Sequence, residues 1–141
     1  MPSAWQIHNA KSTNWRSTDA LENLHLNTNV PKPSHLEPKT ALVLIRAAAI
    51  NARDMMVVTH DPIYPGKHME ELSLCADGAG EVEAVGEGSE WKFGERVILR
   101  PNAWDTEQSQ PSMEPMRGKG AGHEQGTLKQ YAVLVRAHEV F

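Results

Sequence analysis

The fold of this chain is decided by the stretch ADGAGEVEAVGEG at residues 76–88 and by the segment FGERVIL that follows it at residues 93–99. In the first stretch apolar residues alternate with glutamates, which is typical of a strand with one buried face. Gly86 and Gly88 interrupt the run, because glycine adopts the backbone angles that tight turns require. The two segments therefore predict a pair of antiparallel strands joined by a glycine turn.

Other apolar runs predict the remaining elements. The most apolar stretch, ALVLIRAAA at residues 41–49, does not alternate and so predicts a strand buried on both faces. Further strands are expected at residues 4–7, 20–26 and 127–135. Residues 52–58 are expected to form a short helix that Asn51 caps, with Asp54 completing the cap. The chain is thus expected to be mostly β with a short helix, arranged as a barrel-like domain.

Composition limits the function classes. The chain has 141 residues, of which 40% are hydrophobic and 23% charged, and these values favour one soluble globular domain. The formal net charge is −4 and the basic residues are scattered, so neither a nucleic acid nor a membrane is expected as a partner. Cys75 is the single cysteine and cannot form an internal disulfide, which makes a reducing cytoplasm the default expectation.

Three motifs carry a resemblance to a known family. They are DGAGEV at residues 77–82, VGEG at residues 85–88 and FGERV at residues 93–97. Together they resemble the N-terminal, GroES-like domain of the medium-chain dehydrogenase/reductase superfamily. The resemblance implies that residues 1–141 form one GroES-like domain, a partly open β-barrel with a long loop at about residues 100–126. It also implies that the Rossmann domain of such enzymes is absent from this sequence, which we interpret as a truncated or partial chain.

The residues at the family's zinc positions do not favour zinc. Zinc-dependent relatives place a cysteine after the buried strand and a histidine just before Gly-Ala-Gly, and these positions match Asn51 and Ala76. Three protein ligands are needed, and the acidic position that follows, Asp77, cannot hold the ion alone. Relatives with a structural zinc use four cysteines in a lobe that matches residues 101–126, which contain none. We therefore expect no zinc at either site.

Two further residues, His123 and Cys75, have side chains of reactive types. His123 lies in the tripeptide Gly-His-Glu, which matches the zinc-site tripeptide but occurs in the long loop instead of before the strand. A solvated loop histidine is the favoured interpretation. Cys75 precedes the glycine motif with no base identifiable beside it, so it is expected to be a small buried residue and not a nucleophile.

The zinc-free pattern is similar to the quinone oxidoreductase and enoyl reductase branches of the superfamily, in which an Asn follows the buried strand and a Tyr-Pro comes about a dozen residues later. Asn51, Asp54, Tyr64 and Pro65 match this layout. In those branches the resemblance implies hydride transfer from NADPH to a carbon conjugated with a carbonyl. Asn51 and Tyr64 are the candidate catalytic residues, as donors to the developing enolate oxygen. The structural alternatives are that Asn51 only caps the helix and that Tyr64 packs over the turn at Pro65.

The substrate cleft is expected to include Asp54, Met55, Met56 and Asp77. Methionine is soft and apolar and can line a cleft, although one or both methionines can equally fill the core. The hydroxyl that relays protons in zinc alcohol dehydrogenases matches Arg53, so that relay is absent.

Nucleotide binding has no local signal in this chain. The glycines at positions 78, 80, 86 and 88 lack the Gly-x-Gly-x-x-Gly spacing and the following helix, so the chain alone is expected to bind no cofactor, whereas NADPH is implied for a full-length relative. We therefore interpret the chain as the substrate-side domain of a zinc-independent NAD(P)H-dependent oxidoreductase of small carbonyl compounds, inactive in isolation. The alternative is a non-catalytic binding or regulatory module that forms an oligomer with itself or with a full-length relative.

Overall fold

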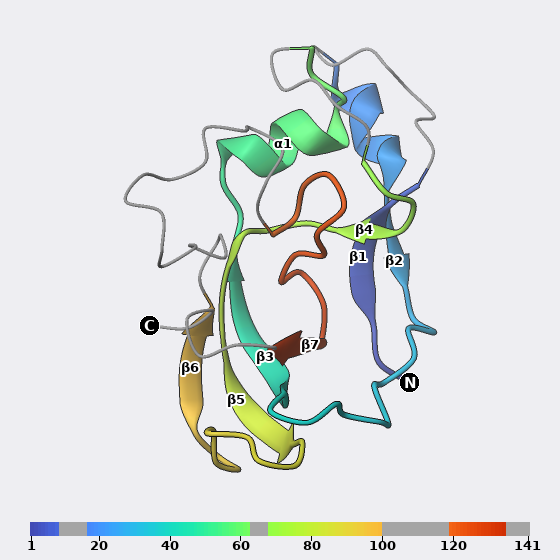
Figure 1. The fold of residues 1–141 in the computed structure, drawn as a ribbon. Coiled ribbons are helices and arrows are strands. Elements are labelled where there is room, and N and C mark those ends of the chain that lie inside the picture. The colour runs from blue at the N-terminus through green and yellow to red at the C-terminus, as the bar shows by residue number, and fades with distance from the viewer. Residues whose placement is uncertain (9–16, 63–67, 100–118, 135–141) are drawn as a thin grey trace.

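A computed structural model describes residues 1–8, 17–62, 68–99 and 119–134 of the chain (Figure 1). The described strands form two sheets, and every strand pair is antiparallel. Neither sheet closes into a barrel within these residues. The expectation of a mostly β domain with a short helix is therefore confirmed.

The first sheet has three strands and the second has four. The three-stranded sheet has the order β2-β1-β4, with β1 at Ala4–Ile7, β2 at Leu24–Asn27 and β4 at Leu72–Ser73. The four-stranded sheet has the order β6-β5-β3-β7, with β3 at Ala41–Ala49, β5 at Asp77–Val85, β6 at Arg96–Leu99 and β7 at Tyr131–Leu134. The 3-10 helix η1 (Thr18–Asn23) and the helix α1 (Ala52–Val58) lie together at one end of the molecule (Figure 1).

The glycine-rich stretch forms the predicted antiparallel pair. Strand β5 pairs with β6 from Gly78 opposite Leu99 to Glu81 opposite Arg96, and on its other side it pairs with β3. The register with β3 shifts twice, and Gly80 lies beside the second shift. A Cβ atom added at Gly80 would lie 2.4 Å from the Leu44 carbonyl oxygen, so only glycine allows the two strands to approach this closely.

Strand β3 has the predicted bounds but is buried on both faces only at its beginning. Ala41, Leu42 and Val43 are at most 2% exposed, whereas the residues after them are half-buried or exposed. This buried start lies within the part of β3 that has a neighbouring strand on each side, since β7 pairs only with the residues from Ala41 to Leu44. The second half of β3 therefore extends beyond its short neighbour toward α1.

The prediction of a strand at residues 20–26 is wrong for its first half, which forms η1. The Ser17 side chain accepts a hydrogen bond from the Asp19 N–H at 3.1 Å and so starts a helical turn. The turn ends at Asn23, whose side-chain amide donates to the Val58 carbonyl oxygen at 2.9 Å and so ties η1 to α1. Only the alternation around Leu24 and Leu26 produces a strand, β2.

The segment before β7, residues 119–130, joins the two sheets. The Trp5 N–H of β1 donates to the Leu128 carbonyl oxygen at 2.9 Å, and the Ile45 N–H of β3 donates to the Gln130 carbonyl oxygen at 2.8 Å. Figure 1 shows this segment running between the sheets on its way to β7. The expected strand at residues 127–135 is thus shorter in the described part of the chain, because its first residues bond to both sheets instead of to one.

Two apolar cores follow from this arrangement. One fills the inner side of the four-stranded sheet and consists of Ala41, Val43, Val82, Trp91, Val97, Leu99, Ala132 and Leu134. The other lies between α1 and the three-stranded sheet and consists of Ile7, Val57, Val58, Leu72, Leu74, Cys75 and Ala121. The end of β3, the start of α1 and the start of β5 meet beside the second core.

Candidate functional site

The candidate site begins at the N-terminus of α1. The Asn51 backbone is extended, with φ of −134°, and its Oδ1 accepts a hydrogen bond from the Arg53 N–H at 3.0 Å. In return, Asp54 Oδ2 accepts from the Asn51 N–H at 2.8 Å. The two side chains thus form the capping box that starts the helix, so the predicted cap and the predicted helix bounds are confirmed.

The second carboxylate oxygen of Asp54 reaches a different part of the chain. Asp54 Oδ1 accepts from the Cys75 N–H at 2.9 Å, and Asp54 is only 1% exposed. Cys75 has φ of +67°, a left-handed conformation that costs a residue with a side chain about 1–2 kcal/mol. A charge-assisted hydrogen bond of this kind contributes about as much, so Asp54 holds α1 and the turn before β5 in one arrangement.

The Cys75 side chain is chemically inert in this setting. Burial raises the pKa of the thiol to about 12, and the nearby Asp54 carboxylate acts in the same direction. Cys75 is fully buried, and at neutral pH its sulfur is a protonated thiol. The expectation of a small buried residue at this position is confirmed.

Asp77 lies at the same end of the sheet as Asn51. In the ladder between β3 and β5, Ala49 is opposite Asp77, and Asn51 follows Ala49 by two positions. The Thr127 hydroxyl donates to the Asp77 carbonyl oxygen at 2.8 Å, which fixes the backbone here while the Asp77 side chain remains exposed. A Cβ atom at Gly78 would lie 2.7 Å from the Thr127 Cβ, so the glycine allows this contact.

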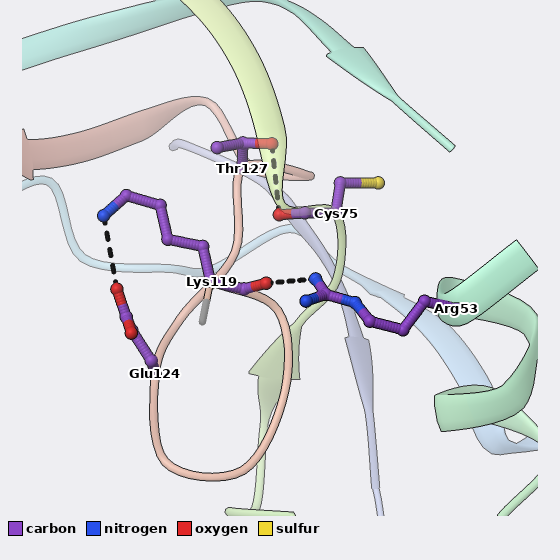
Figure 2. A network of polar contacts seen from close by, with 5 residues as sticks. All are labelled: Arg53, Cys75, Lys119, Glu124 and Thr127. Carbon is purple, nitrogen blue, oxygen red and sulfur yellow. Dashed lines mark hydrogen bonds and ion pairs between the residues drawn. The ribbon is translucent and has the colours of Figure 1, made fainter. Parts of the chain in front are cut away.

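A polar network connects α1 to the segment before β7 (Figure 2). The Arg53 guanidinium donates to the Lys119 carbonyl oxygen, and the Lys119 ammonium pairs with Glu124 Oε1 at 3.2 Å. Thr127 N–H donates to the Cys75 carbonyl oxygen at 2.9 Å. The sequence pattern did not identify Lys119, Glu124 or Thr127 as partners of this site. Lys119 is 66 positions from Arg53 and Thr127 is 52 positions from Cys75, so these contacts leave no local spacing signal, and Glu124 joins the network only through Lys119.

Two histidines of this region lie beside the network. The Gly122 N–H donates to His68 Nδ1 at 3.0 Å, which requires an unprotonated nitrogen. Burial lowers the pKa of His68, and the charges of His60, Arg53 and His123 lower it further. His68 is therefore neutral at pH 7, and His123 is exposed in its loop.

The residues at the family's catalytic zinc positions do not fit the metal. Asn51 uses its side-chain oxygen as the helix cap, and Ala76 is a buried methyl group without a donor atom. Among the described residues, no three His, Cys, Asp or Glu side chains are placed to hold a metal ion. Whether the protein purifies without zinc remains a prediction.

The expected cleft residues fall into two groups. Met55 is 44% exposed and Met56 is half-buried, and both line a hollow of about 480 Å³ between α1 and η1. Asp54 and Asp77 are not among the residues that line this hollow, and neither is Asn51, the first candidate catalytic residue. Tyr64, the second candidate catalytic residue, lies outside the described residues.

The α1 N-terminus does not fit the pyrophosphate of a dinucleotide. A phosphate usually binds a helix N-terminus by accepting hydrogen bonds from its free backbone N–H groups. Here the Asp54 carboxylate accepts from the Asn51 N–H, and the Asn51 side-chain oxygen accepts from the Arg53 N–H. Within the described ranges, no parallel strand pair with a crossover helix is present either.

Comparison with known proteins identifies the family. Residues 37–141 match the alcohol dehydrogenase GroES-like domain, and the chain belongs to this family. No curated protein sequence matches the chain significantly. In the described part of the chain, no helix has the length and apolar character needed to cross a membrane.

Solved structures of medium-chain dehydrogenases and reductases have the same fold. An NAD-dependent alcohol dehydrogenase is 25% identical, with a TM-score of 0.74 over 100% of this chain and 39% of its own. A 2-octenoyl-CoA carboxylase reductase from a Streptomyces species is 24% identical, with a TM-score of 0.72 over 99% of this chain and 39% of its own. A quinone oxidoreductase from Pseudomonas syringae pv. Tomato DC3000 is 22% identical, with a TM-score of 0.61 over 100% of this chain and 33% of its own. The chain thus spans 33% to 39% of the length of these proteins.

The Asp54→Asn variant tests the double role of the buried carboxylate. An amide has one oxygen, so it can accept from either the Asn51 N–H or the Cys75 N–H but not from both. We expect the free energy of unfolding to fall by about 2–4 kcal/mol, because one buried N–H loses its acceptor and a buried amide group gains no partner. Cys75, as the single cysteine, should also be alkylated by iodoacetamide faster than in the wild type.

The matched control is Asp77→Asn, which changes an exposed carboxylate two residues beyond the same turn. Its unfolding free energy should stay within about 0.5 kcal/mol of the wild type. Wild-type stability and unchanged cysteine alkylation in Asp54→Asn would contradict the assigned role.

Proposed function

We propose that this chain is the substrate-side domain of a zinc-independent, NAD(P)H-dependent oxidoreductase that reduces a carbon conjugated with a carbonyl group. The observation that carries the proposal is the orientation of Asn51 at the exposed end of β3. The family membership and the match to solved medium-chain reductases support the reaction class.

The Asn51 side chain can cap the helix and donate to a substrate at the same time. The Arg53 backbone N–H can only donate, so the Asn51 oxygen must face the helix and its NH2 group must face away. Asn51 is exposed, and this NH2 group has no acceptor among the described residues. A donor held in this way is suited to stabilise the negative charge that develops on an enolate oxygen.

Asp54 acts in this proposal as a positioning residue. Both of its oxygens accept from backbone N–H groups, and its burial leaves no oxygen for a substrate. The first of these bonds fixes the backbone of Asn51, and with it the direction of the Asn51 amide. Asp77, which is exposed beside Asn51, remains a candidate for contact with the substrate, as does Tyr64.

In the full-length enzyme a nucleotide-binding domain would hold the nicotinamide cofactor, which would supply the hydride. The methyl group of Ala76 and the capping role of Asn51 support a mechanism in which amide and hydroxyl donors replace the zinc ion. Met55 and Met56 supply apolar surface at the hollow beside α1, where the hydrocarbon part of a substrate can lie. We propose no reduction by the 141 residues alone.

The first experiment measures metal content and turnover of the purified 141-residue chain. We expect far less than one zinc ion per chain by elemental analysis, and no NADPH oxidation above background with an enone or a quinone. One zinc ion per chain would overturn zinc independence, and enzyme-like turnover would overturn the need for another domain. If the chain contains no zinc, oxidises no NADPH and binds tightly to a full-length relative, the regulatory-module alternative would be favoured.

The second experiment uses Asn51→Asp, which keeps a capping oxygen and removes the amide donor. We expect its stability to match the wild type, whereas Asn51→Ala should lose about 1 kcal/mol because the cap is lost. The probe is 4-nitrophenolate, whose conjugated oxyanion resembles an enolate. The wild type should show chemical-shift changes at the Asn51 side-chain amide, and Asn51→Asp should bind the probe at least tenfold more weakly. Equal binding by both proteins would contradict the donor role.

A further inference from the structure

Lys129 lies outside the candidate site, in the segment that joins the two sheets. It borders a cleft of about 230 Å³ whose walls include Leu99, Ala132 and Val133 on the apolar side and Lys119 and Glu124 on the polar side. The Lys129 backbone N–H donates to the Thr127 carbonyl oxygen at 2.8 Å, so the main chain at this position is fixed. The side chain is only partly buried, which leaves a route to it from solvent.

The charges that the structure describes around this cleft offer the Lys129 amine no counter-ion. The one carboxylate among the described lining residues, Glu124, pairs with Lys119 at 3.2 Å. No carboxylate in the described ranges lies within ion-pair distance of Lys129. Lys129 also lines a second hollow together with Arg46, which pairs with Glu81 at 3.8 Å. The described groups that line the two hollows beside Lys129 are therefore apolar residues, neutral polar residues and two cations that are each paired with a glutamate.

This environment favours the neutral amine. Burial lowers the pKa of Lys129 to about 8, and the neighbouring charge of Lys119 contributes in the same direction. At pH 7.5 about a quarter of the Lys129 side chains would carry a free lone pair, compared with roughly one in a thousand for a lysine at the ordinary pKa. Desolvation beside another cation is a known way to make a lysine nucleophilic.

We propose that Lys129 is a covalent site for small aliphatic aldehydes, which it binds as an imine. The neutral amine adds its lone pair to the carbonyl carbon, and one of its two protons moves from nitrogen to the carbonyl oxygen to give a carbinolamine. The hydroxyl group then leaves as water with the second nitrogen proton, which forms the carbon–nitrogen double bond with no change in oxidation state and no further reactant. The small volume of the cleft and its Leu99, Ala132 and Val133 walls favour a short apolar chain on the carbonyl carbon.

The test exposes the 141-residue chain to propionaldehyde and cyanoborohydride at pH 7.5 and locates the alkylated lysines by mass spectrometry of peptides. The internal reference is Lys32, whose pKa is raised by its hydrogen bond to Glu83. We expect Lys129 to be modified at least tenfold faster than Lys32, with a rate that levels off above about pH 8. Modification of Lys129 at the rate of Lys32, or a rate that keeps rising to pH 10, would overturn the proposal.

Two variants of the Lys119–Glu124 pair distinguish an effect of charge on Lys129 reactivity from an effect of misfolding. Lys119→Gln removes the adjacent cation, so Lys129 should react several-fold more slowly in a protein whose circular dichroism is unchanged. Glu124→Gln removes the only described carboxylate of the cleft, so Lys129 should react at least as fast as in the wild type. If Lys129 is alkylated at the same rate in the wild type and in both variants, the proposed influence of the neighbouring charges on Lys129 would be contradicted. Neither NADPH nor an enone is used, so this result is independent of the proposed reductase function.

Discussion

One buried carboxylate holds the functional end of this domain together. Asp54 accepts one backbone N–H from Asn51, its near neighbour, and one from Cys75, which is 21 positions away along the chain. The first bond starts α1, and the second stabilises a left-handed turn that a residue with a side chain seldom adopts. Because both bonds use the same side chain, Asp54 holds the helix and the turn in one arrangement.

The arrangement of the other residues depends on this link. Cys75 leads into β5, so the turn sets where Asp77 lies relative to Asn51 at the end of the four-stranded sheet. The Cys75 carbonyl oxygen accepts from Thr127, and Arg53 holds Lys119, so the segment before β7 follows the same turn. This segment then bonds to both sheets and presents Lys129 to its cleft. The proposed hydride-acceptor site and the proposed aldehyde site therefore share one structural frame.

Local sequence signals predicted the elements that local forces produce. The cap at Asn51, the helix after it and the strands at residues 4–7 and 41–49 have the bounds that their patterns indicate. Strand β4 was missed because its two residues carry no periodic signal, and η1 was missed because Ser17 starts a turn where the apolar pattern suggested a strand.

The candidate site was predictable only in part. Asn51 and Asp54 were found from the spacing of a helix cap, whereas the bond from Asp54 to Cys75 depends on tertiary structure and has no sequence signature. The same is true of Lys129, whose chemistry depends on burial and on the distant Lys119. Residue type and spacing thus identified the family and the helix cap. Long-range contacts, which the sequence does not reveal, determine which side chains are hydrogen-bonded, exposed or buried.

Amide hydrogen exchange by NMR tests the central role of Asp54 most directly. The measured quantities are the exchange rates of the Asn51 and Cys75 backbone amides in the wild-type chain. Both amides should be protected to a similar degree and at a level comparable to that of Val82 within β5, because one buried carboxylate accepts from both. Exchange of either amide at the rate of an unstructured peptide would show that the carboxylate does not join the helix to the turn.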